Sequence, residues 1–154
     1  MYKRILVATD GSEFARAAID AAVSLAALGK GTVVAVHVRA PVSKYLYGES
    51  AIVIPPETLS SIRDQGKAIS REYLEAVEAA ARARNVACES IDVEDASIAE
   101  AILRTAGDKG CDLIVMASHG RGAVSRALLG SETNRVLAHA TQAVLVTRSD
   151  AHGR

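Results

Sequence analysis

Short apolar runs alternate with longer amphipathic stretches along this chain. Uninterrupted runs of Val, Ile, Leu and Ala are typical of strands that a parallel sheet buries on both faces. Such runs occupy residues 4–9, 32–38, 113–117 and 143–147. The run at 86–93 is weaker and alternates apolar with polar residues, as is typical of a strand at a sheet edge. The pattern therefore predicts five strands, of which 113–117 is central.

Helical periodicity fills the intervals between these runs. Residues 14–28 carry one apolar face at positions 15, 18, 19, 22, 23 and 26. Residues 57–84 predict a long helix with a stripe through Leu59, Ile62, Gly66, Ile69, Tyr73, Ala76, Val77 and Ala80. Ser97 and Glu100 match a capping box that opens a third helix, and a fourth helix is expected at 131–139. Alternating strands and helices predict an α/β fold with a single doubly wound open sheet of five parallel strands and helices on both faces.

Composition and charge narrow the range of functions. The chain has 154 residues, enough for one domain, which we place at 1–148 with a polar C-terminal tail at 149–154. Its 18 Lys plus Arg balance 18 Asp plus Glu, and it has no Trp and one Phe. A basic field and stacking aromatics are both missing, so we expect no nucleic-acid partner and no anionic membrane partner. Any anion site must be local.

The cysteines and the apolar segments bear on the compartment. Cys88 and Cys111 stand far apart with no metal-ligand spacing, so we interpret both as small buried apolar residues. The sequence shows no secretory apolar segment and no apolar span near ~20 residues. We therefore expect a cytoplasmic protein.

The segment 39–56 has no clean period and is punctuated by Pro41, Gly48, Pro55 and Pro56. A long irregular segment at the carboxyl end of a strand is often a lid or a contact surface. A disordered insertion is the alternative, and the sequence leaves both open.

A glycine-containing loop follows the predicted central strand. Ser118, His119 and Gly120 end the apolar run, and Gly130-Ser131 precede the last predicted helix. Such a loop exposes backbone N–H groups in front of a helix dipole, so its natural ligand is an anion, above all a phosphate. Glycines more often serve turn geometry alone, so the spacing by itself is weak evidence.

The whole pattern closely resembles the universal stress protein family. Its nucleotide-binding members carry Gly-x2-Gly-x9-Gly-Ser/Thr in this place, and here Gly120 is followed after nine residues by Gly130-Ser131. The resemblance extends from residues 2–12 (Tyr-Lys-Arg-Ile-Leu-Val-Ala-Thr-Asp-Gly-Ser) to 142–148. It implies an adenine nucleotide alpha hydrolase-like fold with strand order 3-2-1-4-5. In such a sheet the ligand lies between the first and fourth strands, where the strand order reverses.

The resemblance also implies which residues line the nucleotide. Val38 would offer backbone groups to the adenine edge, and Asp10 is the candidate ligand for Mg²⁺ or Mn²⁺. The full predicted set is Ala8, Thr9, Asp10, Val38, Met116, Ala117, His119, Gly120, Arg121, Gly130, Ser131, Glu132 and Thr133. Arg126 faces either the phosphates, solvent or a dimer partner. Asp10 can equally serve as a turn and helix-cap residue, and His119 as a hydrogen-bonded structural residue.

One departure from the family motif concerns Ala117, which replaces its first glycine. An added Cβ narrows the approach of a ribose or phosphate only if the position needs positive φ or contacts the ligand. Strand conformation itself tolerates alanine.

We expect a cytoplasmic stress-response protein that binds ATP, or AMP or ADP, and acts as a nucleotide-sensing homodimer. The apolar run at 143–147 ends the sheet, and an uncovered edge invites pairing with a second copy. Two alternatives stay open: a non-nucleotide interaction module that uses its dimer surface and the loop at 45–54, and a slow ATPase. No P-loop, no Ser-His-Asp order and no paired carboxylates are present, and His37 and His139 have no partner that the sequence identifies, so no catalytic residue is predicted.

Overall fold

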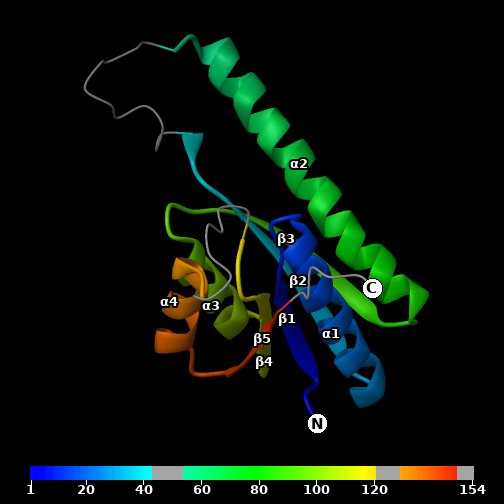
Figure 1. Cartoon of the computed structure of the whole chain (residues 1–154). Coiled ribbons are helices and arrows are strands. Elements are labelled where there is room, and N and C mark those ends of the chain that lie inside the picture. Colours follow the sequence, from blue (N-terminus) through cyan, green and yellow to red (C-terminus); the bar gives the residue numbers. More distant parts are fainter. Residues whose placement is uncertain (43–53, 121–128, 149–154) are drawn as a thin grey trace, which may run out of the picture.

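The computed structural model describes residues 1–42, 54–120 and 129–148 (Figure 1). Arg121, Arg126, most of the 39–56 segment and the 149–154 tail lie outside the described residues. The elements in chain order are β1 (Arg4–Ala8), α1 (Glu13–Gly29), β2 (Thr32–Arg39), α2 (Pro56–Ala83), β3 (Ala87–Glu94), α3 (Ile98–Asp108), β4 (Leu113–Ala117), α4 (Ser131–His139) and β5 (Ala143–Thr147).

The described strands form one parallel sheet in the order β3-β2-β1-β4-β5. Ile5 of β1 pairs with Val33 on one side and with Leu113 on the other, which fixes β1 in the middle of the sheet. Helices α1 and α2 cover one face, and α3 and α4 cover the other (Figure 1). The predicted α/β class, strand order and edge position of β3 are confirmed.

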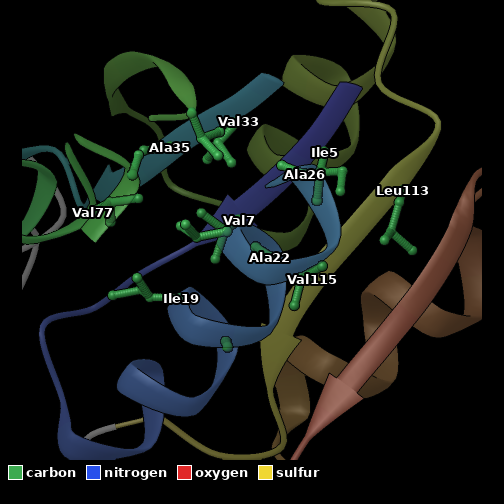
Figure 2. Close-up of a cluster of buried hydrophobic side chains, with 14 of the residues drawn as sticks. Ile5, Val7, Ile19, Ala22, Ala26, Val33, Ala35, Val77, Leu113 and Val115 are labelled. Carbon is green, nitrogen blue, oxygen red and sulfur yellow. The ribbon is translucent and has the colours of Figure 1, made fainter. Parts of the chain in front are cut away.

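Side-chain alternation along the strands divides the core into two layers. Ile5 and Val7 face α1 and α2, together with Val33 and Ala35, as Figure 2 shows. Leu6 and Ile114 face α3 and α4. In α1 the buried positions are those that the periodicity predicts, namely 15, 18, 19, 22, 23 and 26, with Gly29 added. Their small alanines let this helix pack close to the sheet.

The predicted apolar face of α2 is only partly correct: it includes the buried Val77 but misses Ser70, Leu74 and Ala81. The residues that α2 buries are Ser70, Leu74, Val77 and Ala81, whereas Ile62 and Ile69 are 41% and 45% exposed. Only the C-terminal half of this helix lies over the sheet, while its N-terminal half extends past it (Figure 1). Ser70 is tolerated in the buried face because its hydroxyl donates to Asp92 Oδ1 at 2.7 Å.

The predicted capping box of α3 is wrong. The side chain of Ser97 makes no cap hydrogen bond. The carboxylate of Glu132, at the start of α4, accepts the N–H of Ala99 at 2.9 Å instead, and Asp95 accepts the N–H of Ser97 at 2.9 Å. Helices α3 and α4 pack side by side, so a residue of one satisfies a backbone donor of the other.

The cysteines are free thiols, and burial raises the pKa of both. Cys111 is buried as predicted, but Cys88 is only half-buried. Over the residues that the structure describes, no helix combines the length and the apolar character that crossing a bilayer requires.

Candidate functional site

A cavity of about 460 Å³ lies at the carboxyl ends of β1, β2 and β4. Its walls also include the first residues of α3 and α4. The lining residues are Ala8, Thr9, Asp10, Ala15, Val36, His37, Val38, Ile98, Ile102, Met116, Ala117, His119, Gly120, Gly130, Ser131, Glu132 and Thr133. Every residue of the sequence-predicted set lines this cavity except Arg121, which lies outside the described residues.

The end of β4 is tied to the start of α4. The Gly130 N–H donates to the Ser118 carbonyl at 2.8 Å, and the Thr133 hydroxyl donates to the Ala117 carbonyl at 3.1 Å. A Cβ on Gly130 would lie 3.3 Å from the same Ser118 oxygen, so glycine suits this close approach. Segments on both sides of the glycine loop therefore meet at one edge of the cavity.

The N-terminus of α4 faces this cavity without a side-chain cap. Gly130 occupies the N-cap position and has no side chain to offer, and the first-turn residues Ser131, Glu132 and Thr133 line the cavity. Uncapped first-turn N–H groups and the helix dipole together create positive potential. The geometry thus favours an anionic group at this end of the cavity.

The turn after β1 forms the opposite wall. Asp10 Oδ1 accepts the Ser12 N–H at 3.0 Å, and Ser12 Oγ in turn accepts the Ala15 N–H at 3.3 Å as the cap of α1. Asp10 therefore has the turn role that the sequence allowed. A Cβ on Gly120 would lie 2.9 Å from Asp10 Oδ2, so the two strand ends approach closely across the cavity.

The predicted polar residues His119 and Glu132 both make local contacts. Ser118 Oγ and His119 Nδ1 lie 2.9 Å apart, and the imidazole lies 6.2 Å from the Phe14 ring, centroid to centroid. The Glu132 carboxylate, besides accepting from Ala99, lies 3.9 Å from the Arg135 guanidinium. Among the described residues, no group of three or more His, Cys, Asp or Glu side chains is arranged to hold a metal ion.

The sequence did not predict five of the lining residues: Ala15, Val36, His37, Ile98 and Ile102. Val36 lies on the same face of β2 as Val38, so strand alternation could have identified it. Ile98 begins α3, and the helix that follows a strand often contributes its first turn to a ligand site in such sheets. His37 does have partners: its Nδ1 lies 2.7 Å from the Thr9 carbonyl, and its ring lies 5.1 Å from that of Tyr73.

An ion-pair cluster joins the C-terminal ends of β2 and β3. Arg39 donates to Asp92 at 2.7 Å and to Glu94 at 2.9 Å. Burial opposes ionisation of Asp92, but hydrogen bonds from Arg39 and Ser70 outweigh it and hold the pKa of that carboxyl below its usual value. The cluster fastens the C-terminal half of α2 to the sheet.

Both the sequence and the fold of this chain are similar to those of known proteins. The family model described as universal stress protein family matches residues 1–148. A universal stress protein of Thermus aquaticus is 36% identical over 156 aligned residues, covering 96% of this chain and 100% of that protein. Universal stress protein YxiE of Bacillus subtilis is 32% identical over 149 aligned residues, with the same coverage. The solved structure of MJ0577, from Methanocaldococcus jannaschii, has a TM-score of 0.82 at 26% identity and covers 99% of both chains.

Two further solved universal stress proteins contain adenine nucleotides. One, in complex with cAMP, has a TM-score of 0.70 at 22% identity and covers 95% of this chain and 97% of its own. Another, from Archaeoglobus fulgidus, is in complex with dAMP and has a TM-score of 0.67 at 20% identity, covering 94% and 97%. At these identities the likeness to this chain concerns the fold.

Proposed function

The chain belongs to the universal stress protein family, and from this premise we propose that it binds an adenine nucleotide, ATP first and AMP or ADP as alternatives, in the cavity between β1 and β4. A single universal stress protein domain over residues 1–148 is part of this proposal. The observation that carries it is the uncapped N-terminus of α4 facing a cavity at the point where the strand order reverses.

The chemistry of the walls suits the two ends of a nucleotide. Val38, Ile98, Ile102 and Met116 form an apolar wall that would take the base, with the β2 backbone at Val38 available to the adenine edge. The first turn of α4, with Gly120 and Gly130, would take ribose and phosphates. Structural relatives in complex with cAMP and dAMP support this class of ligand.

Ala117 is compatible with this proposal. It pairs with Thr147 in the parallel sheet, and among the described non-glycine residues positive φ occurs at Lys30 and Asn85. A Cβ at position 117 is therefore sterically allowed in the strand.

A divalent cation, Mg²⁺ or Mn²⁺, fits this site only in part. The Asp10 carboxylate lines the cavity beside Gly120, where the segments that follow β1 and β4 approach each other. With one protein carboxylate, the cation would take most of its oxygen ligands from the phosphates and water. Bound there, it would neutralise phosphate charge next to Asp10.

Calorimetric titration of nucleotide-free protein with ATP and Mg²⁺ tests the proposal. Gly120→Ala would push a Cβ to 2.9 Å from Asp10 Oδ2, and we expect binding about tenfold weaker; Gly130→Leu should abolish it. Gly107→Ala is the matched control, because a Cβ at Gly107 meets nothing within 4 Å. Absence of heat in the wild type at high protein concentration, or equal binding by all four proteins, would contradict the proposal.

The proposal extends to a cytoplasmic, nucleotide-sensing homodimer in the stress response. Free thiols at Cys88 and Cys111 suit a reducing compartment. β5 is an outer strand without charged residues, which supports pairing with its copy in a second chain. A monomer at micromolar concentration in light scattering would contradict the dimer.

Two alternatives are separated by simple experiments. A non-nucleotide interaction module would show no nucleotide retained through purification and no titration heat. A slow ATPase is favoured only by the Asp10 carboxylate in the cavity. Turnover that disappears in Asp10→Ala while binding persists would support it.

A further inference from the structure

The turn that carries Asp10 begins where β1 leaves the sheet. The Thr9 N–H still donates to the Val36 carbonyl of β2 at 3.0 Å, but the Thr9 carbonyl lies 2.7 Å from a side chain, the Nδ1 atom of His37. A carbonyl oxygen only accepts hydrogen bonds, so Nδ1 must carry the proton. The His37 ring therefore holds the first backbone carbonyl after β1, at the start of the turn.

A second ring holds the next part of the same turn. Gly11 has a φ of +72°, and a Cβ there would lie 2.2 Å from Cε1 of Tyr73, so the tyrosine ring packs directly on the Gly11 backbone. The His37 and Tyr73 rings meet edge to face, with centroids 5.1 Å apart and planes at 86°. Edge-to-face contact fixes the orientation of both rings.

Both rings are in turn held by the sheet and by α2. In the parallel register His37 pairs with Asp92, whose carboxylate accepts from Ser70, one helical turn before Tyr73. Arg39 Nε donates to the same carboxylate oxygen, Asp92 Oδ1, at 2.7 Å. The Asp10 turn is thus supported by β2, β3 and α2, which lie outside the glycine loop.

We infer that His37 and Tyr73 are positioning residues of the nucleotide site: together they set the Thr9–Gly11 backbone, and through it the Asp10 carboxylate that lines the cavity. The inference rests on the proposed function. Asp10 bonds within the turn to the Ser12 N–H, so a displaced Thr9 or Gly11 moves the carboxylate with the backbone. A misplaced contact in a preorganised site weakens binding without unfolding the protein.

Two isosteric substitutions separate this role from packing. The side-chain amide of His37→Asn can place an N–H where Nδ1 stands, whereas His37→Gln places it nearer the position of Nε2. We expect His37→Asn to bind ATP within about twofold of the wild type and His37→Gln about fivefold to tenfold more weakly, the effect of one lost hydrogen bond. The two variants should melt at similar temperatures. Equal affinities in both variants would overturn the role of His37.

The tyrosine offers an independent pair. Tyr73→Phe keeps the ring on Gly11 and should retain affinity, while Tyr73→Ala removes it and should weaken binding to a similar extent as His37→Gln. If His37→Gln does not fold, the two Tyr73 variants still test the inference. Tyr73 is only partly buried on a helix, so we expect both variants to fold. Unchanged binding in Tyr73→Ala would overturn the inference.

A spectroscopic measurement keeps the inference separate from the proposed function. Nitrogen-15 NMR of the neutral His37 ring should show the proton on Nδ1, and the amide signals of Gly11 and Ser12 should shift in His37→Gln but not in His37→Asn. If the wild type binds no nucleotide, the proposed function fails. The His37 nitrogen signals and the Gly11 and Ser12 amide signals then still test whether His37 positions the turn. A proton on Nε2, or identical amide signals in both variants, would overturn it.

Discussion

The two outer strands of the sheet, β3 and β5, differ in the charge of the residues along their unpaired edges. β3 carries three acidic residues, and each one has a cation beside it. Glu89 pairs with Arg4 at 2.7 Å and also with Lys109, while Arg39 pairs with Asp92 and Glu94. A charged edge resists pairing with another strand because ions would have to lose water.

β5 shows the opposite arrangement. Its five residues, Ala143 to Thr147, carry no charge, and Val144, Leu145 and Val146 are half-buried. The buried Thr147 hydroxyl has no hydrogen-bond partner among the described residues. Edge position alone therefore does not identify an interface. The charged residues of β3 disfavour pairing of that edge with another strand, whereas the uncharged edge of β5 would allow pairing with a second copy of the chain.

The largest expected effect comes from disrupting strand pairing at the uncharged edge of β5. Thr147 accepts the Ser118 N–H at 2.8 Å, so its backbone faces β4 and that of Val146 faces outward. Val146→Pro removes an outward donor from each copy and should weaken dimerisation about 100-fold, while the β4 ladder persists. Val146→Thr keeps the donor and is the control. Sedimentation equilibrium measures the change, and equal association of both variants would exclude pairing through β5.

The charged edge at β3 is tested by removing the guanidinium group of Arg39. The Arg39 side chain is 12% exposed and serves both Asp92 and Glu94, so Arg39→Met should lower the free energy of unfolding by about 1–2 kcal/mol. The value stays modest because water still reaches the carboxylates. Urea denaturation provides the measurement. The double variant Arg39→Met with Asp92→Asn should recover part of the loss, and strictly additive losses would argue against the ion pair.

A pH titration sharpens the same comparison. Because the pKa of Asp92 is lowered in the folded state, its contribution is present above the ordinary aspartate pKa, about 3.9, and is lost as pH falls through the lower folded value. The wild type should therefore be more stable than Asp92→Asn at pH 7, with the difference shrinking below about pH 4. Thermal unfolding from pH 7 to pH 3 measures it. A difference that is constant with pH would show that Asp92 contributes through packing alone.

The smallest effect concerns the Thr147 hydroxyl. Thr147→Val replaces a buried group that lacks a partner among the described residues by a methyl of similar volume, so the free energy of unfolding should rise by up to about 1 kcal/mol. Thr141→Val, at an exposed position before β5, is the control. Destabilisation by Thr147→Val in chemical denaturation would mean that the hydroxyl has a partner in the protein in solution.

Local patterns predicted the elements well but the long helix poorly. In α1 every predicted apolar position is buried, because the whole helix lies on the sheet. In α2 the spacing of Ile62 and Ile69 predicted a buried face, yet both are exposed, because half of this helix extends past the sheet. Periodicity tells which residues share a face and not how far the covered surface reaches.

The same contrast holds at the site. Asp10, Gly120 and Gly130 could be predicted because turns and phosphate loops need particular residues at short spacing. His37 could not, because it reaches the cavity from β2 and its partner, the Thr9 carbonyl, lies far away in the chain. The capping of α3 by Glu132 is a second example, in which donor and acceptor are 33 positions apart in the sequence.

By itself, the sequence determined the strands, most helix boundaries and the family, since each of these depends on residues close together or on a motif read in order. Tertiary structure alone decided which face of α2 is buried, that Glu132 caps α3, and that His37 and Tyr73 support the Asp10 turn. These contacts join residues that lie far apart in the sequence and meet only after the sheet has formed. Tertiary packing brings them together, and no local preference of the chain does so.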